Sequence, residues 1–105
     1  MELTIKDRIY IPVFLLSITK SGLIKASLIH STTEALKFTP AEIQEYQLRD
    51  NTLGFTEWKP AKENSFNIEF TPGQMEIIKE GIEIMDKAEQ ISADMIPTIS
   101  KFISV

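Results

Sequence analysis

The first apolar segment of the chain runs from Leu3 to Leu16 and shows no clear helical period. Apolar and polar residues alternate at its start, whereas from Ile9 onward it is apolar on both sides. This combination is typical of a strand that begins at a sheet edge and ends in the interior. Pro12 would remove one backbone donor from the strand, which predicts a bulge or an unpaired side there. We therefore expect a strand over Leu3–Leu16.

A helix is predicted next, over Leu23–Lys37, after a small polar connection. Its apolar residues fall near one face at helical spacing, and Ser21 is positioned to cap its start. The cluster Ser31-Thr32-Thr33 has weak helix propensity and weakens the middle of the segment. The pattern still favours a helix that packs one side on the core.

Two six-residue segments, 38–43 and 70–75, carry the same helix-start pattern of Phe, Thr, Pro, any residue, Glu or Gln, and an apolar residue. Thr is the N-cap, and Pro occupies the first helical position, where no amide donor is needed. Glu or Gln bonds back to the cap amide, and Phe packs on the apolar residue of the first turn. The likeness ends with these six residues, which favours independent capping over an internal duplication.

The remaining elements complete an α+β pattern. The first capped helix ends near Gln47, and residues 49–54 have turn composition. Strands are predicted over 55–59 and 65–70 with a hairpin loop between them, followed by a helix over 72–88 and a last helical segment over 92–103. The order is β-α-α-β-β-α-α. We expect one domain over residues 1–105, with a three-stranded sheet and helices packed on one face of it.

The residue types exclude several kinds of chemistry. The chain has no cysteine and a single histidine, His30, which removes thiol nucleophiles and zinc sites built on cysteine or paired histidines. Glu34 lies one helical turn after His30, a pairing that any helix surface can make, so a surface or structural histidine is favoured. The four glycines are isolated and form no phosphate-binding loop. We expect no catalytic residue, no cofactor, no metal and no enzyme activity.

Charge is unevenly distributed along the chain. The net charge is −4, yet residues 1–37 hold five basic and three acidic residues, and residues 38–105 hold six basic and twelve acidic ones. A nucleic-acid-binding protein needs a positive face, so nucleic acid is an unlikely partner.

A secretory signal is the alternative for the start of the chain. Lys6 and Arg8 precede the apolar run 9–18, as basic residues do in such signals. Glu2 and Asp7 interrupt the basic part, however, and the run is too short to span a bilayer. We expect a core segment, no membrane association and a cytoplasmic location.

Two aromatic residues are candidates for recognition. Trp58 lies in a polar segment, and strand alternation that buries Phe55 would turn Trp58 to the opposite face. A partly exposed Trp is a frequent anchor in interfaces. Trp58 and Tyr46 are therefore candidates for an interface or for ligand stacking, with a core position as the alternative.

The helix over 72–88 offers the clearest indication of a partner. One stripe of apolar residues suffices to dock the helix, and a second stripe consists of Ile77, Ile84 and Ile91. The second stripe needs a cover, either the C-terminal segment or another protein molecule. Glu76, Glu80 and Glu83 form an acidic face, which is either solvated or a docking face for a basic partner. A hard cation is not expected there, because it needs oxygens converging from a loop or cleft.

The opening Leu3-Thr4-Ile5-Lys6-Asp7-Arg8-Ile9-Tyr10-Ile11-Pro12, together with Glu57-Trp58, resembles small proteins of tailed bacteriophages and prophages of low-GC Gram-positive bacteria. The resemblance implies a phage-encoded protein in the host cytoplasm and carries over no functional residue. We therefore expect a non-enzymatic accessory protein that binds another protein or associates with itself as a homodimer. The alternative is a protein that binds a nucleotide signal and counters host defence, with Trp58 or Tyr46 and Arg8 or Arg49 lining its pocket.

Overall fold

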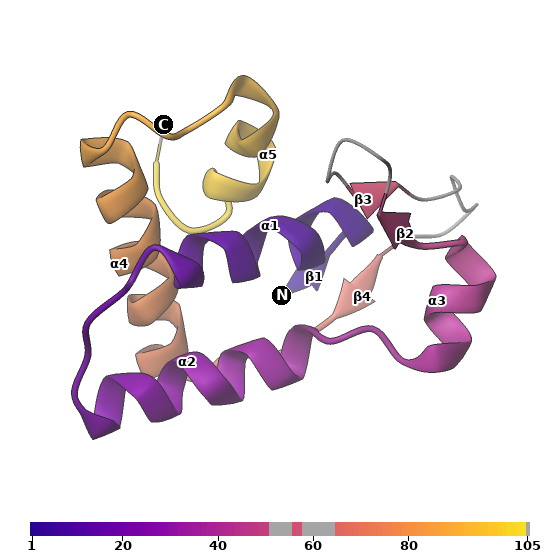
Figure 1. Cartoon of the computed structure of the whole chain (residues 1–105), viewed down its shortest axis with the longest axis horizontal. Helices are drawn as coiled ribbons and strands as arrows, with labels where there is room; N and C mark the ends of the chain where they lie inside the picture. The colour runs from indigo at the N-terminus through magenta and orange to yellow at the C-terminus, as the bar shows by residue number, and fades with distance from the viewer. Residues whose placement is uncertain (51–55, 58–64, 105) are drawn as a thin grey trace.

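A computed structural model describes residues 1–50, 56–57 and 65–104 of the chain (Figure 1). Helices account for most of the described residues, and the strands are two residues long. The elements are β1 (Glu2–Leu3), α1 (Ile5–Leu16), α2 (Leu23–Leu36), α3 (Pro40–Tyr46), β2 (Arg49–Asp50), β3 (Thr56–Glu57), β4 (Phe66–Asn67), α4 (Pro72–Lys87), a 3₁₀ turn η1 (Ala93–Met95) and α5 (Ile96–Ile99).

The segment expected to be a strand over Leu3–Leu16 is helix α1, so this prediction was wrong. A capping box starts the helix: the Asp7 amide donates to Thr4 Oγ1 at 3.2 Å, and the Thr4 amide donates to Asp7 Oδ2 at 2.8 Å. One face of α1 is buried at helical spacing, and two of its members are charged. The buried residues are Ile5, Asp7, Arg8, Ile11, Phe14 and Leu15. Because Asp7 and Arg8 belong to the inward face, the apolar residues alone do not show the helical period.

Pro12 lies inside α1 rather than at a strand bulge. An interior proline removes one backbone hydrogen bond and usually disfavours a helix. Here the capping box at Thr4 and the burial of a complete helix face outweigh that loss.

The expected three-stranded sheet is also wrong. With residues 5–16 helical, only Glu2–Leu3 remains extended, and it pairs antiparallel with Phe66–Asn67. Arg49–Asp50, expected to be a turn, forms a second antiparallel pair with Thr56–Glu57. The two pairs belong to separate sheets. Neither is a layer on which helices could pack, so the core lies between helices.

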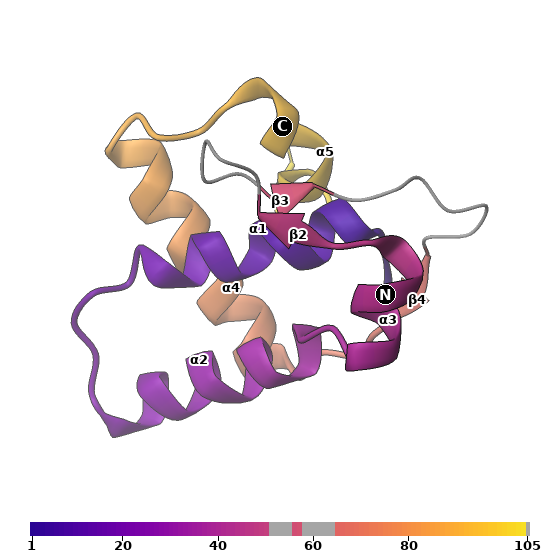
Figure 2. The same ribbon diagram turned by 45° about the vertical axis from the view of Figure 1, so that its right-hand side comes forward.

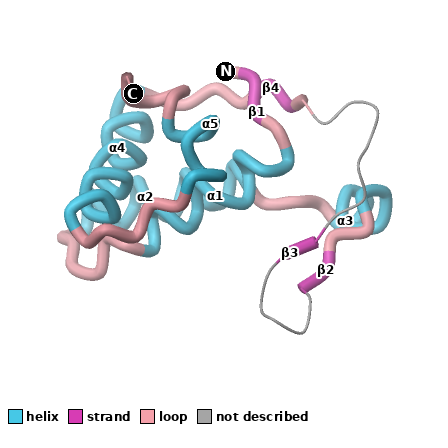
Figure 3. The backbone as a smooth tube through the Cα atoms, turned by 90° about the horizontal axis from the view of Figure 1, so that it is seen from above, coloured by secondary structure: helices cyan, strands magenta, loops and turns pink. Residues whose placement is uncertain are grey.

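Helix α1 occupies the middle of the molecule (Figures 1 and 2). α2 runs on one side of it and α5 lies on the other, while α4 contacts both α1 and α2. Seen from above, α3 and the β2–β3 pair form an end that projects from the helices (Figure 3). The core is built from the following buried residues: Leu3, Ile11, Phe14, Leu15, Leu36, Ile77, Ile78, Ile82, Met85, Ile99 and Phe102.

Both predicted capping boxes are confirmed. The Glu42 amide donates to Thr39 Oγ1 and the Thr39 amide to Glu42 Oε1, at 3.1 and 2.9 Å. Thr71 and Gln74 make the equivalent pair of bonds at the start of α4. The cap expected from Ser21 is wrong: Gly22 is the N-cap of α2, with no side-chain bond.

The crossing of α1 and α4 depends on a glycine. Gly81 is buried, and a Cβ atom built on it would lie 2.4 Å from the carbonyl oxygen of Phe14. The Ser17 hydroxyl lies 3.0 Å from the Gly81 carbonyl oxygen and donates across the same crossing. The two helix backbones therefore approach more closely than any side chain at position 81 would allow.

We predict that Gly81→Ala lowers the free energy of unfolding by about 2 kcal/mol, because the methyl group forces α1 and α4 apart and this outweighs the better helix propensity of alanine. Urea denaturation followed by circular dichroism measures the change. Gly22→Ala is the matched control, since no atom lies within 4 Å of the added methyl group. Equal effects of the two substitutions would contradict the close approach.

Candidate functional site

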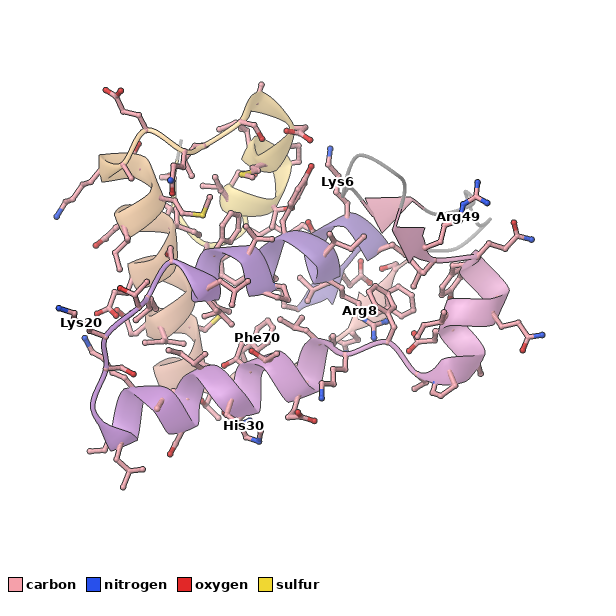
Figure 4. All side chains as sticks on the ribbon, in the orientation of Figure 1. Lys6, Arg8, Lys20, His30, Arg49 and Phe70 are labelled. Atoms are coloured by element: carbon pink, nitrogen blue, oxygen red, sulfur yellow. The ribbon has the colours of Figure 1, made fainter. Side chains whose placement is uncertain are left out.

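The side chain of Arg8 is buried at the meeting point of α1, α2 and α3 (Figure 4), and only 5% of its surface is exposed. Its Nε donates to the Leu36 carbonyl at 3.3 Å, and one terminal nitrogen donates to the Lys37 carbonyl at 2.7 Å. Both terminal nitrogens also donate to the Glu42 carboxylate, at 2.7 and 3.3 Å. This fork geometry is specific to a guanidinium group.

Two aromatic rings complete the surroundings of Arg8. The guanidinium carbon lies 4.1 Å from the ring centre of Phe38 and 4.5 Å from that of Phe66. Tyr46 packs edge-on against Phe66, with ring centres 5.9 Å apart. Hydrogen bonding from Arg8 is the main reason that the pKa of Glu42 is lowered. Arg8 is therefore fully engaged inside the protein, and Tyr46 packs in the core beside it.

A groove of about 470 Å³ opens beside this cluster, between α1, the end of α2 and α3. Most of its lining is apolar, from Ile9, Pro12, Leu36, Phe38, Ile43 and Leu48. The lining also includes three basic residues, Arg8, Lys37 and Arg49, and no acidic residue among those described. We call this hollow the α1 groove.

The outward face of α1 continues the apolar lining of the groove. Ile9, Pro12, Val13 and Leu16 occupy positions i, i+3, i+4 and i+7, so they share the side of the helix opposite the buried face. Exposure rises along this side, to 37% at Val13 and 77% at Leu16. We call these four residues the outer stripe. α1 thus carries apolar residues on two opposite faces: the inner face is buried, and the outer face stays partly exposed in the part of the chain that the structure describes.

The second stripe predicted on α4 does not form a single surface. Ile77 is 4% exposed and belongs to the core, whereas Ile84 is 37% exposed. Ile91 is partly buried and lines a small apolar hollow of about 220 Å³ with Ile96, Ile99 and Ile103 of the C-terminal segment. The cover of Ile91 comes from within the chain, as one of the two alternatives expected.

The predicted acidic residues of α4 differ in their partners. Glu80 binds Lys25 of α2 at 2.7 Å, and Glu76 lies 3.6 Å from Lys79 on the same helix. Glu83 is exposed and makes no ion pair within the described part of the chain. Across residues 1–50, 56–57 and 65–104, no three His, Asp or Glu side chains gather as metal ligands would.

The other predicted residues are less informative. His30 is exposed and points away from the molecule on α2 (Figure 4). Trp58 lies outside the described residues, so its prediction as an anchor stays a prediction. No described helix combines the length and the apolar character needed to cross a membrane.

Asp7 anchors the C-terminal segment to the start of α1. Its carboxylate accepts from the buried Thr98 hydroxyl at 2.5 Å and forms an ion pair with Lys101. Tyr10, on the next turn, donates to Asp94, whose carboxylate also accepts from Ser92. Burial alone would raise the pKa of Asp7, but the bonds from Lys101, Thr98 and the Thr4 amide outweigh it and lower the pKa.

Comparison of the chain with protein-family models, with curated proteins and with solved structures found no match. The resemblance to phage proteins therefore stays a prediction, and function has to be argued from the surfaces described above.

We predict that Arg8→Lys destabilises the protein by about 2–3 kcal/mol, because an ammonium group cannot reach both carbonyls and both carboxylate oxygens, and stacks less well between two rings. Urea denaturation gives the change in the free energy of unfolding. Arg49→Lys makes the same chemical change at an exposed position and should shift this energy by no more than about 0.5 kcal/mol. An unchanged stability of Arg8→Lys would contradict the role of the fork.

We also predict that Asp7→Asn is less stable than the wild type at neutral pH and that the difference shrinks in acid. A carboxyl whose pKa is lower in the folded protein stabilises it above the unfolded pKa of 3.8 and loses this effect as pH falls through the folded pKa. Thermal melts between about pH 7 and pH 2.5 cover this window. A difference that stays constant across the whole range would show that the Asp7 charge contributes nothing.

Proposed function

We propose that this protein acts by binding another protein through the outer stripe and the α1 groove, and not by catalysis. The supporting observation is the exposure of an apolar helix face whose opposite face is already filled by the core. The fold requires only the inner face of α1, so polar residues at Val13 and Leu16 would satisfy it equally well. Contiguous exposed apolar surface of this kind marks interaction sites in soluble proteins.

The α1 groove adds to the outer stripe a hollow that side chains of a partner could fill. A partner lying along α1 would cover Leu16 and Val13 and would insert side chains between Ile9, Phe38 and Ile43 at the other end. An apolar centre with charged residues at its edge is the usual composition of a protein interface. These features favour a protein partner over solvent as the natural cover of this face.

A small anionic ligand is the second candidate. The volume of the α1 groove falls in the range of ligand pockets, and its basic lining suits a phosphate or carboxylate. Of the residues expected for a nucleotide site, however, Arg8 is held by Glu42 and two carbonyls, and Tyr46 packs on Phe66. Lys37, which pairs with Glu34 at 2.8 Å, would have to exchange this partner for the anion, and the exposed stripe would stay unexplained.

We predict that Leu16→Asp and Val13→Asp abolish partner binding without unfolding the protein. Each introduces a charge into a contact that must be dry, while the exposed positions tolerate it in the free protein, with stability within about 0.5 kcal/mol of wild type. Affinity capture from cells that carry the gene, followed by titration of the purified partner, measures the loss.

The matched control is Leu23→Asp, which changes an equally exposed leucine (84%) at the start of α2, outside the stripe. We expect it to bind as the wild type does. If all three variants capture the same proteins as the wild type, the outer stripe is not the binding surface and the proposal fails.

A further inference from the structure

We infer that the small hollow between α4 and the C-terminal segment 90–104 binds a small organic cation, with its apolar body inside the hollow and its ammonium group at the rim. This site is separate from the outer stripe and the α1 groove, so it goes beyond the proposed function. The inference is carried by the lining of the hollow, which is apolar except for two carboxylates that have no partner among the described residues. We call it the isoleucine hollow.

The attachment of the C-terminal segment leaves room for this hollow. Asp7 bonds to Thr98 and Lys101, and Tyr10 donates to Asp94, so the segment is held to the start of α1. Accordingly, α5 lies beside α1 (Figure 1). Within the described part of the chain, no side-chain hydrogen bond joins the segment to α4. A volume of about 220 Å³ remains between them.

The interior of the isoleucine hollow is apolar. The lining consists of Ile82, Glu83 and Asp86 of α4 and of Ile91, Ile96, Ile99 and Ile103 of the C-terminal segment. A water molecule is held in a cavity only where it finds several polar partners, and isoleucine side chains offer none. An apolar group that enters the hollow buries its surface and gains contacts on several sides.

The volume of the hollow restricts the size of the ligand. Drug-sized ligands occupy pockets of about 300–1,000 Å³, whereas an apolar cavity of about 150 Å³ accommodates a benzene ring. A hollow of about 220 Å³ therefore suits a single ring or a short alkyl chain.

The two acidic residues of the lining select the charge of the ligand. Glu83 and Asp86 are exposed, and neither makes an ion pair or a side-chain hydrogen bond with a described residue. No basic residue belongs to the described lining, and none of its side chains can donate a hydrogen bond. An ammonium group is therefore favoured at the rim, and a carboxylate or phosphate is repelled.

Asp86 is better placed than Glu83 to bind the cation. It follows Ile82 by one helical turn, so the two share one side of α4. Glu83 also borders the neighbouring surface of α4, where Lys25 and Lys87 lie. We therefore expect Asp86 to contribute most of the selectivity.

Three probes of similar shape test the inference: phenethylamine, phenethyl alcohol and phenylacetate, which are cationic, neutral and anionic at neutral pH. We expect the amine to bind at least about fivefold tighter than the alcohol and phenylacetate to bind weakest. The preference for the amine should shrink as salt rises from about 50 to 500 mM. NMR titration of protein labelled at the isoleucine methyl groups reports affinity and location together, with the largest shifts at the isoleucines of the hollow.

Variants separate the charge of the rim from the apolar interior. Asp86→Asn should remove most of the preference for the amine and leave the affinity for the alcohol unchanged. Glu76→Gln neutralises a carboxylate on the same helix outside the hollow and should keep the preference.

A larger side chain in the hollow should exclude all three probes. We expect Ile91→Phe to lower their affinities at least about fivefold, because the phenyl ring takes up the space of the ligand. Ile96→Phe makes the same change at a position that is 39% exposed, where folding is less sensitive to added volume. Thermal melts show that both variants are folded.

The inference fails if no isoleucine of the hollow shifts with any probe, if phenylacetate binds as tightly as phenethylamine, or if both folded phenylalanine variants bind the amine as the wild type does. Shifts confined to Ile9 and Ile43 would place the probes in the α1 groove and would also overturn it. We expect Leu16→Asp to bind the probes as the wild type does, so failure of this site and failure of the proposed protein interaction are separate results.

Discussion

The buried guanidinium group of Arg8 is the constraint on which the arrangement of the helices depends. A buried charge is costly unless every donor finds an acceptor, and a single helix cannot supply these acceptors. The chain provides them by ending α2 at Leu36 and starting α3 three residues after Lys37. The carbonyls of Leu36 and Lys37, left without helical partners, and the carboxylate of Glu42 then face Arg8. The position of α3 relative to α1 follows from this set of bonds.

Asp7 is a second buried charged residue on α1, and its partners lie in a different part of the chain from those of Arg8. Adjacent helical residues point about 100° apart, so Asp7 reaches the C-terminal segment while Arg8 reaches α2 and α3. Its bonds to Thr98 and Lys101 place α5 beside α1. Two consecutive charged residues thereby connect α1 to segments that lie 28 to 94 positions away in the chain. This explains why α1 lies in the middle although it is the first helix.

The same two charges explain what could and could not be predicted from the sequence. The starts of α3 and α4 were predictable, because a capping box is a local arrangement that six residues encode completely. α1 was not, because its inward face mixes Asp7 and Arg8 with Ile11 and Phe14, and its outer face is apolar. A reading that assigns charges to the surface and apolar residues to the core finds no helical period in such a segment. The usable signal was Thr4 with Asp7 three residues later, a capping box with aspartate in place of glutamate.

The α1 groove could not be predicted from the sequence, because its shape depends on how Arg8 holds α3. The prediction of a three-stranded sheet was wrong for the same reason, because it depended on a strand where the chain forms α1.

The distribution of charged and apolar residues between the two faces of α1 also links the fold to the proposed binding. Charged residues fill part of the interior, and the apolar residues that would normally lie there are found on the outside at Ile9, Pro12, Val13 and Leu16. An inward-facing ion pair contributes less to stability than well-packed apolar residues of similar size would, and exposed apolar residues contribute almost nothing. Stability therefore does not explain the pattern of α1, whereas the proposed contact with a second protein would.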